Sequence, residues 1–547
     1  MSRHALIGLA ALLATALSLL LRLFFAQDGH FGFDDMHYAR LSAQVASGTF
    51  ATTHDHYTFR WPLILLNGAV FYLLGISDYT AAIVPITATL ATAGMVWRMG
   101  RHLSLTARVF AVFMTAWSEW IFFYSTKIMP DILILLAATA MLWLWYEGRH
   151  GALQKHPFGA GSGLAAAFFF GFLSKETLLL LAPFWAFVAA KEVQNGVNKR
   201  FWSGAIGSGA VLFGLYFAWM YGATGHWGGR FRAIAENAYL NACSYDQLPV
   251  EHLLRRIGDE LWRVFFETGV AAGIILLLAS RRLSASTPER QIQQTAWWWL
   301  LLSNFMSISP THYVPLCPDI RHYLFVVPPL ALVSAHTIED YLRHDPLRRR
   351  DGRLPVLAIG AALMAAWKFP AQLLLYGVFA GGALLALWGK WKHNIPAGVM
   401  WIPFFVMLAI KPFDVFRAAQ KSNWTEQKRI VHEYLDTTAP TGRTLTVITN
   451  QAEKNMDEYL LRFDTSQVRW LTFKTATPEA VASSDSVVLL LNGATAWMSN
   501  TDWDKLPLWV RQPNQSRQLI ATGAHIELFG LQKDSLLRRI VAEQATQ

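Results

Sequence analysis

The sequence is short of charge and of cysteine. Only 15% of its 547 residues are charged, whereas soluble globular proteins carry about a quarter. It has two cysteines, which excludes a disulfide-rich secreted scaffold. Hydrophobic residues make up 53% of the chain, which excludes an intrinsically disordered protein. Low charge combined with this apolar content is typical of a polytopic membrane protein.

Long apolar runs recur along the first three quarters of the chain. Fourteen segments can be marked, and many reach the roughly 17–25 residues that a membrane-spanning helix needs. The first runs from about Ala5 to Ala26. It is longer than the core of a signal peptide and lacks a small-residue cleavage site, so we interpret it as an uncleaved anchor.

Basic residues predict how these segments thread the membrane. Residues 1–411 hold all of the net charge of +10, and residues 412–547 hold fifteen basic and fifteen acidic residues. If segment 61–76 lies on the surface, nineteen Lys and Arg fall in the short loops on one side and about six on the other. Basic loops stay in the cytoplasm. We therefore expect about thirteen transmembrane helices, a cytoplasmic N-terminus and a periplasmic C-terminus.

This threading predicts two domains. Residues 1–411 form a polytopic α-helical transmembrane domain, with two large outer loops at 27–78 and 222–263. The first of these loops carries surface helices, one of them at 61–76. The neutral tail, residues 412–547, is predicted to be a soluble periplasmic domain.

The tail contains short β-rich runs at 445–449, 487–491 and 526–529, which alternate with helical stretches. This alternation is typical of an α/β domain. The two cysteines, Cys243 and Cys317, fall in predicted outer loops, where disulfides can persist. We expect either a bridge between them or two passive thiols.

The strongest motif is Phe-Asp-Asp-Met-His-Tyr at residues 33–38, directly after the first apolar run. Adjacent carboxylates at a membrane surface repel one another and are costly. In a sheltered pocket, such a pair can supply a general base, a metal ligand or both. Tyr38 follows Asp34 by four residues, so both lie on one side of a helix that begins there. The alternative is that Asp34 caps this helix and Asp35 lies in its first turn.

Two further turns fall on the same predicted side of the membrane. One contains Lys127 and Asp131; a cation there suits a phosphate headgroup, and helix capping is the alternative role of Asp131. The other contains Lys175 and Glu176 between two apolar helices. The alternative is that these two residues only lie at the membrane–water interface, with the aliphatic parts of their side chains in the membrane and the charged groups in water.

The same predicted face holds two other groups of polar residues. Arg321 and Tyr323 stand at the entrance to an apolar helix, where they either bind phosphate or anchor the helix at the interface. A candidate divalent-metal site is formed by His54, Asp55 and His56, but the sequence shows no further residues that would complete the metal coordination. Four signals therefore converge on one face, which favours an outward-facing active site.

At these residues the chain resembles bacterial members of glycosyltransferase family 39. This family has the GT-C fold and includes the protein O-mannosyltransferases and the lipid A aminoarabinose transferase. Its first-loop motif, an acidic pair followed by Tyr and a surface helix ending near Gly, is matched from Asp34 to Gly48. Its other motifs are matched by Lys127 with Asp131, Lys175 with Glu176, and Arg321 with Tyr323, although a His separates the last two. The resemblance covers about residues 5–340, and the tail is similar to that of the aminoarabinose transferase.

The resemblance implies inverting transfer of a sugar from a polyprenyl-phosphate donor at the periplasmic face of a bacterial inner membrane. Asp34 matches the catalytic Asp, which would act as general base toward a hydroxyl acceptor or orient a phosphate acceptor. Asp131 would be the second catalytic carboxylate. The predicted substrate-binding residues, some of them cations for the departing phosphate, are Asp35, Tyr38, Arg60, Lys127, Lys175, Glu176, Arg321 and Tyr323.

The expected acceptor is lipid A or another glycolipid, a glycan or a protein. No cofactor is required, although a divalent metal is left open, and no nucleic-acid partner is expected. The main alternative is a transporter or flippase of lipid-linked sugars. Transporters often place polar residues at the bilayer midplane, on broken or repeated helices, whereas here the polar motifs gather at one surface.

Overall fold

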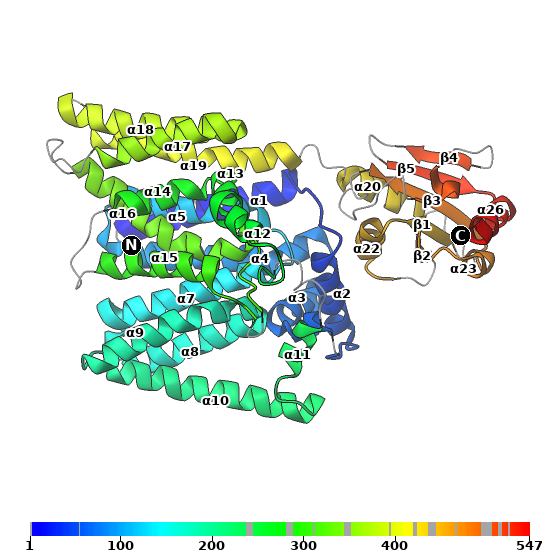
Figure 1. Cartoon of the computed structure of the whole chain (residues 1–547), viewed down its shortest axis with the longest axis horizontal. Helices are drawn as coiled ribbons and strands as arrows, with labels where there is room; N and C mark the ends of the chain where they lie inside the picture. The colour runs from blue at the N-terminus through cyan, green and yellow to red at the C-terminus, as the bar shows by residue number, and fades with distance from the viewer. Residues whose placement is uncertain are drawn as a thin grey trace.

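In the computed structural model, a bundle of roughly parallel helices is followed by a smaller domain built on a β-sheet (Figure 1). The structure describes residues 3–53, 55–236, 244–280, 288–309, 312–343, 352–392, 395–419, 424–435, 445–464, 468–493, 506–511, 517–522 and 526–546. This architecture, a mostly helical membrane domain with a C-terminal α/β domain, confirms the predicted fold class.

The bundle is formed by helices that are apolar along most of their length. They are α1 (Arg3–Phe25), α4 (Asp78–Met99), α5 (Leu105–Ala116), α6 (Glu119–Tyr124), α7 (Asp131–His150), α8 (Pro157–Ser174), α9 (Ala182–Gln194), α10 (Lys199–Thr224), α13 (Leu261–Glu267), α14 (Val270–Ala279), α15 (Pro288–Phe305), α16 (Val327–Arg343), α17 (Arg353–Lys368), α18 (Leu373–Lys392) and α19 (Ala397–Ala419). Seven helices in the described part are long and apolar enough to cross a membrane, or eight if one sharply bent pair forms a single span. The count of about thirteen remains a prediction.

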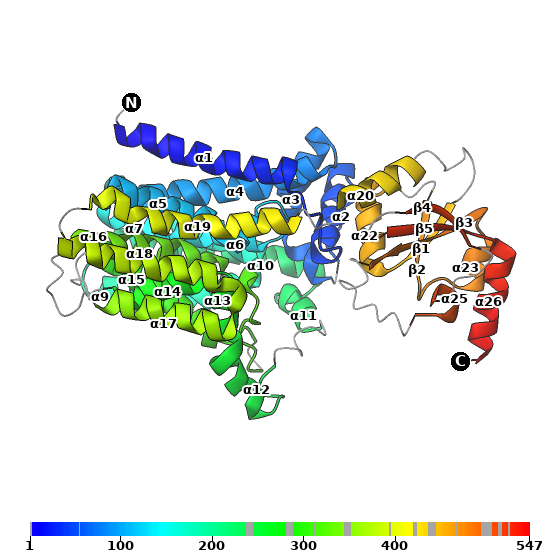
Figure 2. The same ribbon diagram turned by 90° about the horizontal axis from the view of Figure 1, so that it is seen from above.

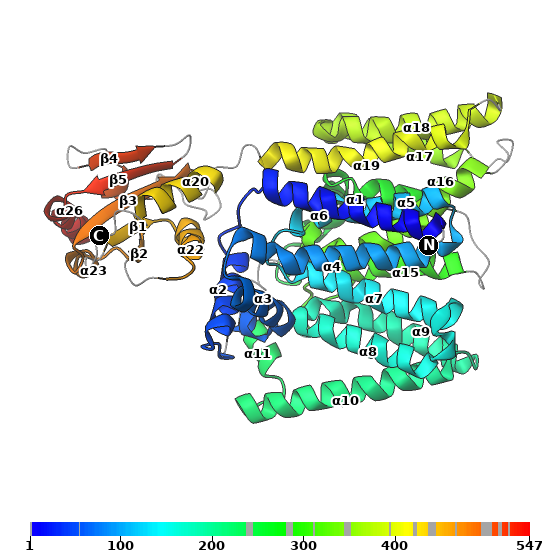
Figure 3. The same ribbon diagram turned by 180° about the vertical axis from the view of Figure 1, so that it is seen from behind.

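One end of the bundle is covered by short helices from the loops. These are α2 (Asp34–Ser47), α3 (Trp61–Leu74), α11 (Gly229–Ala235) and α12 (Val250–Arg255). Shorter helical turns in the same connections are η1 (His56–Phe59), η4 (Glu176–Leu181), η6 (Arg256–Glu260) and η7 (Ile320–Val326). Helix α2 packs on α3, and both lie at the end that carries the sheet domain, whereas the N-terminus lies at the opposite end (Figures 2 and 3).

The C-terminal domain contains one five-stranded sheet of order β2-β1-β3-β5-β4. Its strands are β1 (Leu445–Thr449), β2 (Val468–Thr472), β3 (Ser486–Asn492), β4 (Arg517–Thr522) and β5 (Ile526–Leu531). Strand β1 pairs in parallel with β2 and β3, and β5 is antiparallel to both of its neighbours. All five residues of β1 are buried, as expected for a central parallel strand covered on both faces. The three β-rich runs marked in the sequence are confirmed as β1, β3 and β5.

Helices cover both faces of this sheet. They are α20 (Trp424–Ile430), η9 (Val431–Leu435), α22 (Gln451–Leu460), α23 (Pro478–Ala482), α25 (Leu508–Arg511) and α26 (Lys533–Thr546). The alternation of side chains along β1 sends Val447 into the same hydrophobic core as α22 and Ile448 into a second core with α26. The first of these cores is continuous with the core of the bundle. The sheet domain therefore packs against the bundle through its α20 and α22 face.

The border between the domains was predicted at residues 411/412, and it falls inside α19. This helix contains Pro403 and Pro412 and continues to Ala419, because proline is tolerated in membrane helices where neighbours satisfy the freed carbonyls. The first residue of the sheet domain that the structure describes is Trp424. Cys243 lies outside the described residues, so the two alternatives, a bridge to Cys317 or two passive thiols, both remain predictions.

Candidate active site

Asp34 begins α2 at the covered end of the bundle, and its carboxylate is partly open to solvent. The Tyr57 hydroxyl, from η1, donates to Asp34 Oδ1 at 2.5 Å. Arg321 Nη1, from η7, lies 3.6 Å from Asp34 Oδ2. The side chains of Asp34 and Arg321 are 34% and 29% exposed. Burial and the Asp34 carboxylate raise the pKa of Tyr57, so its hydroxyl keeps its proton and donates. This carboxylate is accessible and keeps acceptor capacity for a substrate hydroxyl.

Beside Asp34, two buried guanidinium groups share one carboxylate. Arg60 contacts the Tyr38 hydroxyl and lies 3.6 Å from Glu176. Arg230, from α11, lies 3.2 Å from the other oxygen of Glu176. Burial alone would favour the protonated form of Glu176, but Arg60 and Arg230 outweigh it and lower its pKa to about 2. Two cations against one anion leave a net positive charge in a sheltered place, which suits a phosphate.

Asp131 lies in a third group with Lys175 and a histidine. Lys175 Nζ donates to Asp131 Oδ1 at 2.8 Å, and His322 Nδ1 lies 3.6 Å from the same oxygen. Burial and the neighbouring Lys175 lower the pKa of His322. Burial alone would lower the pKa of Arg321, but Asp131 and Asp319 outweigh it and raise this pKa, so Arg321 keeps its charge. The Asp131 group therefore flanks the cation that faces Asp34.

Three of the predicted substrate-binding residues are buried in other surroundings. Lys127 donates to Asp28 at 2.6 Å and to the carbonyl of Gly29, which ties down the first loop. Asp35 has no exposed side-chain surface. Tyr323 packs against the Phe265 ring in the core. In this structure, none of the three presents an open side chain beside Asp34.

The metal candidates of the first loop are only partly described. His54 lies outside the described residues. Asp55 lies 2.8 Å from His37 and 3.3 Å from His56. Burial would raise the pKa of Asp55, but hydrogen bonds with these two imidazoles outweigh it and lower the pKa. Among the residues that the structure describes, no cluster of three His, Cys, Asp or Glu side chains is arranged to hold a metal.

Two residues of the site were not among the sequence-based candidates. Arg230 is one of five arginines in the second predicted outer loop, residues 222–263, and this concentration of basic residues on the predicted outer face was a usable signal. In the sequence, His322 only separates the motif residues Arg321 and Tyr323. Its contact with Asp131 depends on the packing of η7 against α7, and local sequence does not reveal such a contact.

A cavity of about 880 Å³ is lined in part by Asp319, the residue that precedes η7. Its walls combine carboxylates such as Asp28 and Asp319 with aromatic side chains such as Trp120, Phe123 and Phe369. Asp319 forms an ion pair with Arg321 at 3.0 Å, and Arg321 faces Asp34, so a single side chain links the cavity wall to the carboxylate. A cavity with polar and apolar walls suits an amphipathic substrate.

Comparison with known proteins gives structural matches only. No protein-family model matches the sequence, and no curated protein matches it. A crystal structure of ArnT from Cupriavidus metallidurans bound to undecaprenyl phosphate matches with a TM-score of 0.59 and 14% identity, covering 95% of this chain and 97% of that one. The apo structure of the same protein gives a TM-score of 0.57 at 14% identity and covers 96% and 98%. The chain therefore has the GT-C fold of ArnT over nearly its whole length.

Proposed function

We propose that this chain is an integral membrane inverting glycosyltransferase. It moves a sugar from a polyprenyl-phosphate donor to an acceptor on the periplasmic face of a bacterial inner membrane. One observation carries the proposal: the accessible Asp34 carboxylate pairs with Arg321 and accepts from Tyr57, whose ring also contacts the Arg60 guanidinium, in a chain with the ArnT fold. The undecaprenyl phosphate bound to ArnT supports a donor of this class.

In the proposed reaction, the acceptor hydroxyl approaches Asp34 and loses its proton to this carboxylate. Its oxygen forms a bond to the anomeric carbon from the side opposite the lipid phosphate. The bond between the anomeric carbon and the phosphate oxygen breaks, and polyprenyl phosphate departs with the bonding electrons. Tyr57 keeps Asp34 oriented through its hydrogen bond. If the acceptor is a phosphate, Asp34 has no proton to take and orients the acceptor instead.

The leaving phosphate needs positive charge that is already in place. Arg60 and Arg230 supply it, since Glu176 neutralises only one of them. Arg321 pairs with Asp34 and, in our proposal, contacts the phosphate or the sugar near the bond that breaks. Asp131 acts through Lys175 and His322 by fixing the electrostatic surroundings of Arg321. These steps do not require a metal.

The proposal is tested with the purified full chain and undecaprenyl-phosphate-linked sugars, one pentose and one hexose, together with an inner-membrane extract as a source of acceptors. Mass spectrometry follows the release of undecaprenyl phosphate and the appearance of a glycosylated product. We expect both with at least one donor. A flippase would move the donor across a vesicle membrane without cleaving it. Transbilayer movement of an uncleaved donor would therefore overturn the proposal in favour of transport.

A further inference from the structure

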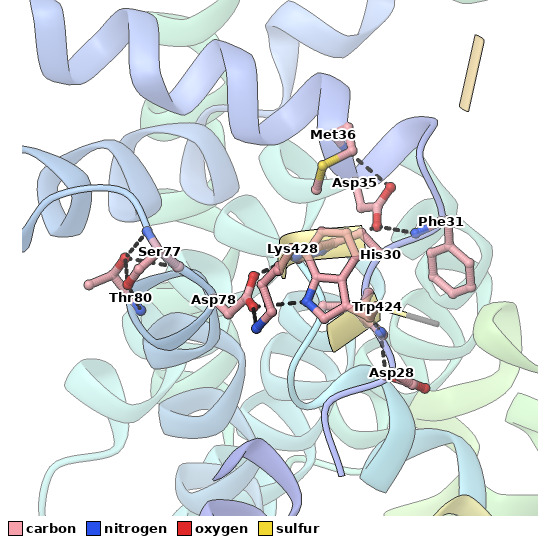
Figure 4. A network of polar contacts seen from close by, with 12 residues as sticks. Asp28, His30, Phe31, Asp35, Met36, Ser77, Asp78, Thr80, Trp424 and Lys428 are labelled. Carbon is pink, nitrogen blue, oxygen red and sulfur yellow. Dashed lines mark hydrogen bonds and ion pairs between the residues drawn. The ribbon is translucent and has the colours of Figure 1, made fainter. Parts of the chain in front are cut away.

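A buried charged cluster involves residues of the loop that leads to Asp34, the N-terminal end of α4 and helix α20 (Figure 4). At its centre is His30, whose side chain has no exposed surface. His30 Nε2 lies 3.2 Å from Asp78 Oδ1, at the start of α4, and Nδ1 lies 3.6 Å from Asp35 Oδ2. Burial opposes a charge on His30, but Asp35 and Asp78 outweigh it and raise the pKa of the imidazole. The histidine therefore bridges two buried carboxylates.

The C-terminal domain completes this cluster. Trp424 Nε1 and Lys428 Nζ, both from α20, donate to Asp78 Oδ2 at 2.9 Å each. The His30 ring packs edge-on against the rings of Trp424 and Tyr459, with centroid distances of 5.2 and 4.8 Å. With His30 protonated, two cations balance two carboxylates. A buried cluster of this kind is costly when one partner is removed, because an uncompensated charge remains.

The same domain also contacts the backbone of the loop that leads to Asp34. Asn455 Nδ2, from α22, donates to the Gly32 carbonyl at 2.7 Å. Gly29 and Gly32 both have left-handed backbones, with φ of +80° and +77°. A Cβ on Gly29 would lie 2.9 Å from the Trp424 ring, and one on Gly32 would lie 2.8 Å from the Ala452 carbonyl oxygen. Only glycine allows so close an approach with this backbone conformation. The loop and the C-terminal domain therefore fit one another closely.

Asp35 connects the C-terminal domain to the backbone around Asp34. Its carboxylate accepts hydrogen bonds from three backbone N–H groups, those of Phe31 at 2.6 Å, Phe33 at 3.3 Å and Met36 at 2.9 Å. These bonds fix the backbone on both sides of Asp34 and set where α2 begins. A continuous set of contacts thus runs from α20 through Asp78 and His30 to Asp35, and from Asp35 to backbone groups on both sides of Asp34.

We propose that the C-terminal domain positions Asp34 for the reaction. The positioning residues, which fix the loop that leads to Asp34, are His30, Asp35, Lys428 and Asn455. This inference rests on the proposed function in that Asp34 is taken as the base. None of these residues touches the substrate. They act by fixing the loop, and a misplacement of about 1 Å at a catalytic group lowers turnover strongly.

The first measurement needs no substrate. Amide hydrogen exchange of the peptide covering residues 28–36 is measured in the full chain in lipid nanodiscs. We expect exchange about tenfold faster in Lys428→Ala, His30→Gln and Asn455→Ala, since each loses a hydrogen bond that opposes local opening. Lys533→Ala is the matched control: this lysine of the same domain donates to the Ser484 carbonyl at 2.6 Å, within the domain, and its removal leaves the loop unchanged. Wild-type exchange in all three variants would overturn the proposal.

The second measurement separates positioning from a purely structural role. We expect a kcat about tenfold lower in Lys428→Ala, with KM for the donor nearly unchanged, and recovery in Lys428→Arg, which retains the charge. Faster loop exchange with wild-type kcat in Lys428→Ala would overturn the positioning role. A failure of the proposed function gives a different result. In that case the wild-type chain transfers no sugar, while hydrogen exchange of residues 28–36 is still faster in the variants.

Discussion

Asp34 and Asp35 are adjacent in the sequence, yet their surroundings differ completely. Asp34 is one third exposed and has two side-chain partners, a hydroxyl and a guanidinium. Asp35 has no exposed surface and accepts from three backbone N–H groups, with an imidazole beside it. A carboxylate whose lone pairs are taken by the backbone holds structure, whereas one with open lone pairs can take a proton. In our proposal, Asp34 therefore acts on the substrate, and Asp35 holds the loop that carries Asp34.

The largest expected effect comes from removing the charge of Asp34. Asp34→Asn keeps the shape of the side chain but cannot take a proton, so sugar transfer falls by about 10²–10⁴-fold. The thermal midpoint stays close to that of the wild type, because Asp34 is partly solvated. Rates of undecaprenyl phosphate release measure the effect. Asp246→Asn, a carboxylate paired with His312 in another loop, is the control and retains activity; equal loss in both variants would contradict the assignment.

Glu176 gives the next largest effect, on stability. Its pKa is about 2 in the folded chain, below the ordinary value of 4.5. Its ion pairs therefore stabilise the fold fully above about pH 4.5, and this stabilisation, of the order of 3 kcal/mol, is lost as the pH falls toward 2. Thermal midpoints of the wild type and Glu176→Gln should differ most at pH 6 and converge in acid. If the difference in thermal midpoint between the two proteins grew as the pH fell, the predicted direction of the pH dependence would be wrong.

The Arg60–Arg230 pair separates donor binding from proton transfer. Arg60→Ala and Arg230→Ala should each weaken the binding of undecaprenyl phosphate about tenfold or more, since each removes one of two buried positive charges that the single Glu176 carboxylate does not balance. Binding is measured by native mass spectrometry or thermal shift. Arg232→Ala is the matched control, because Arg232 lies on α11 together with Arg230 but is exposed. Wild-type binding in both variants would place the phosphate elsewhere.

The smallest expected effect is that of Tyr57→Phe. This substitution removes only the hydroxyl that donates to Asp34, so the carboxylate stays but loses one orienting bond. We expect kcat to fall about tenfold, with KM for the donor nearly unchanged. Tyr38→Phe is the comparison, because the Tyr38 hydroxyl contacts Arg60 instead and its loss should act on donor binding. If Tyr57→Phe instead weakened donor binding and Tyr38→Phe lowered kcat, the roles assigned to the two tyrosines would be exchanged.

Local sequence patterns predicted the elements that carry the site. The helix expected from Asp34 runs to Ser47 and is followed by Gly48, and the helix expected at Asp131 begins there. The charge pattern of the loops led us to expect Asp34, Asp131, Lys175 and Arg321 on one face. In the structure these side chains form two neighbouring groups at one end of the bundle.

The sequence could not separate open from buried members of these motifs. Asp35 and Lys127 match the family pattern as well as Asp34 does, but their burial is set by long-range contacts. His30 contacts Asp35 and packs against Trp424 and Tyr459, residues almost 400 or more positions away. The roles of Arg230 and His322 depend equally on tertiary packing. Pairing of this kind depends on the whole fold and leaves no local periodicity.

The most direct test compares Asp34→Asn with Asp35→Asn in one experiment that records undecaprenyl phosphate binding, its release from a glycosylated donor, and the thermal midpoint. The account predicts that Asp34→Asn binds the lipid, melts like the wild type and releases almost none. It predicts that Asp35→Asn melts at a lower temperature and keeps residual turnover, because the base is present but poorly held. Full release by Asp34→Asn at wild-type stability would contradict the central claim that Asp34 is the base.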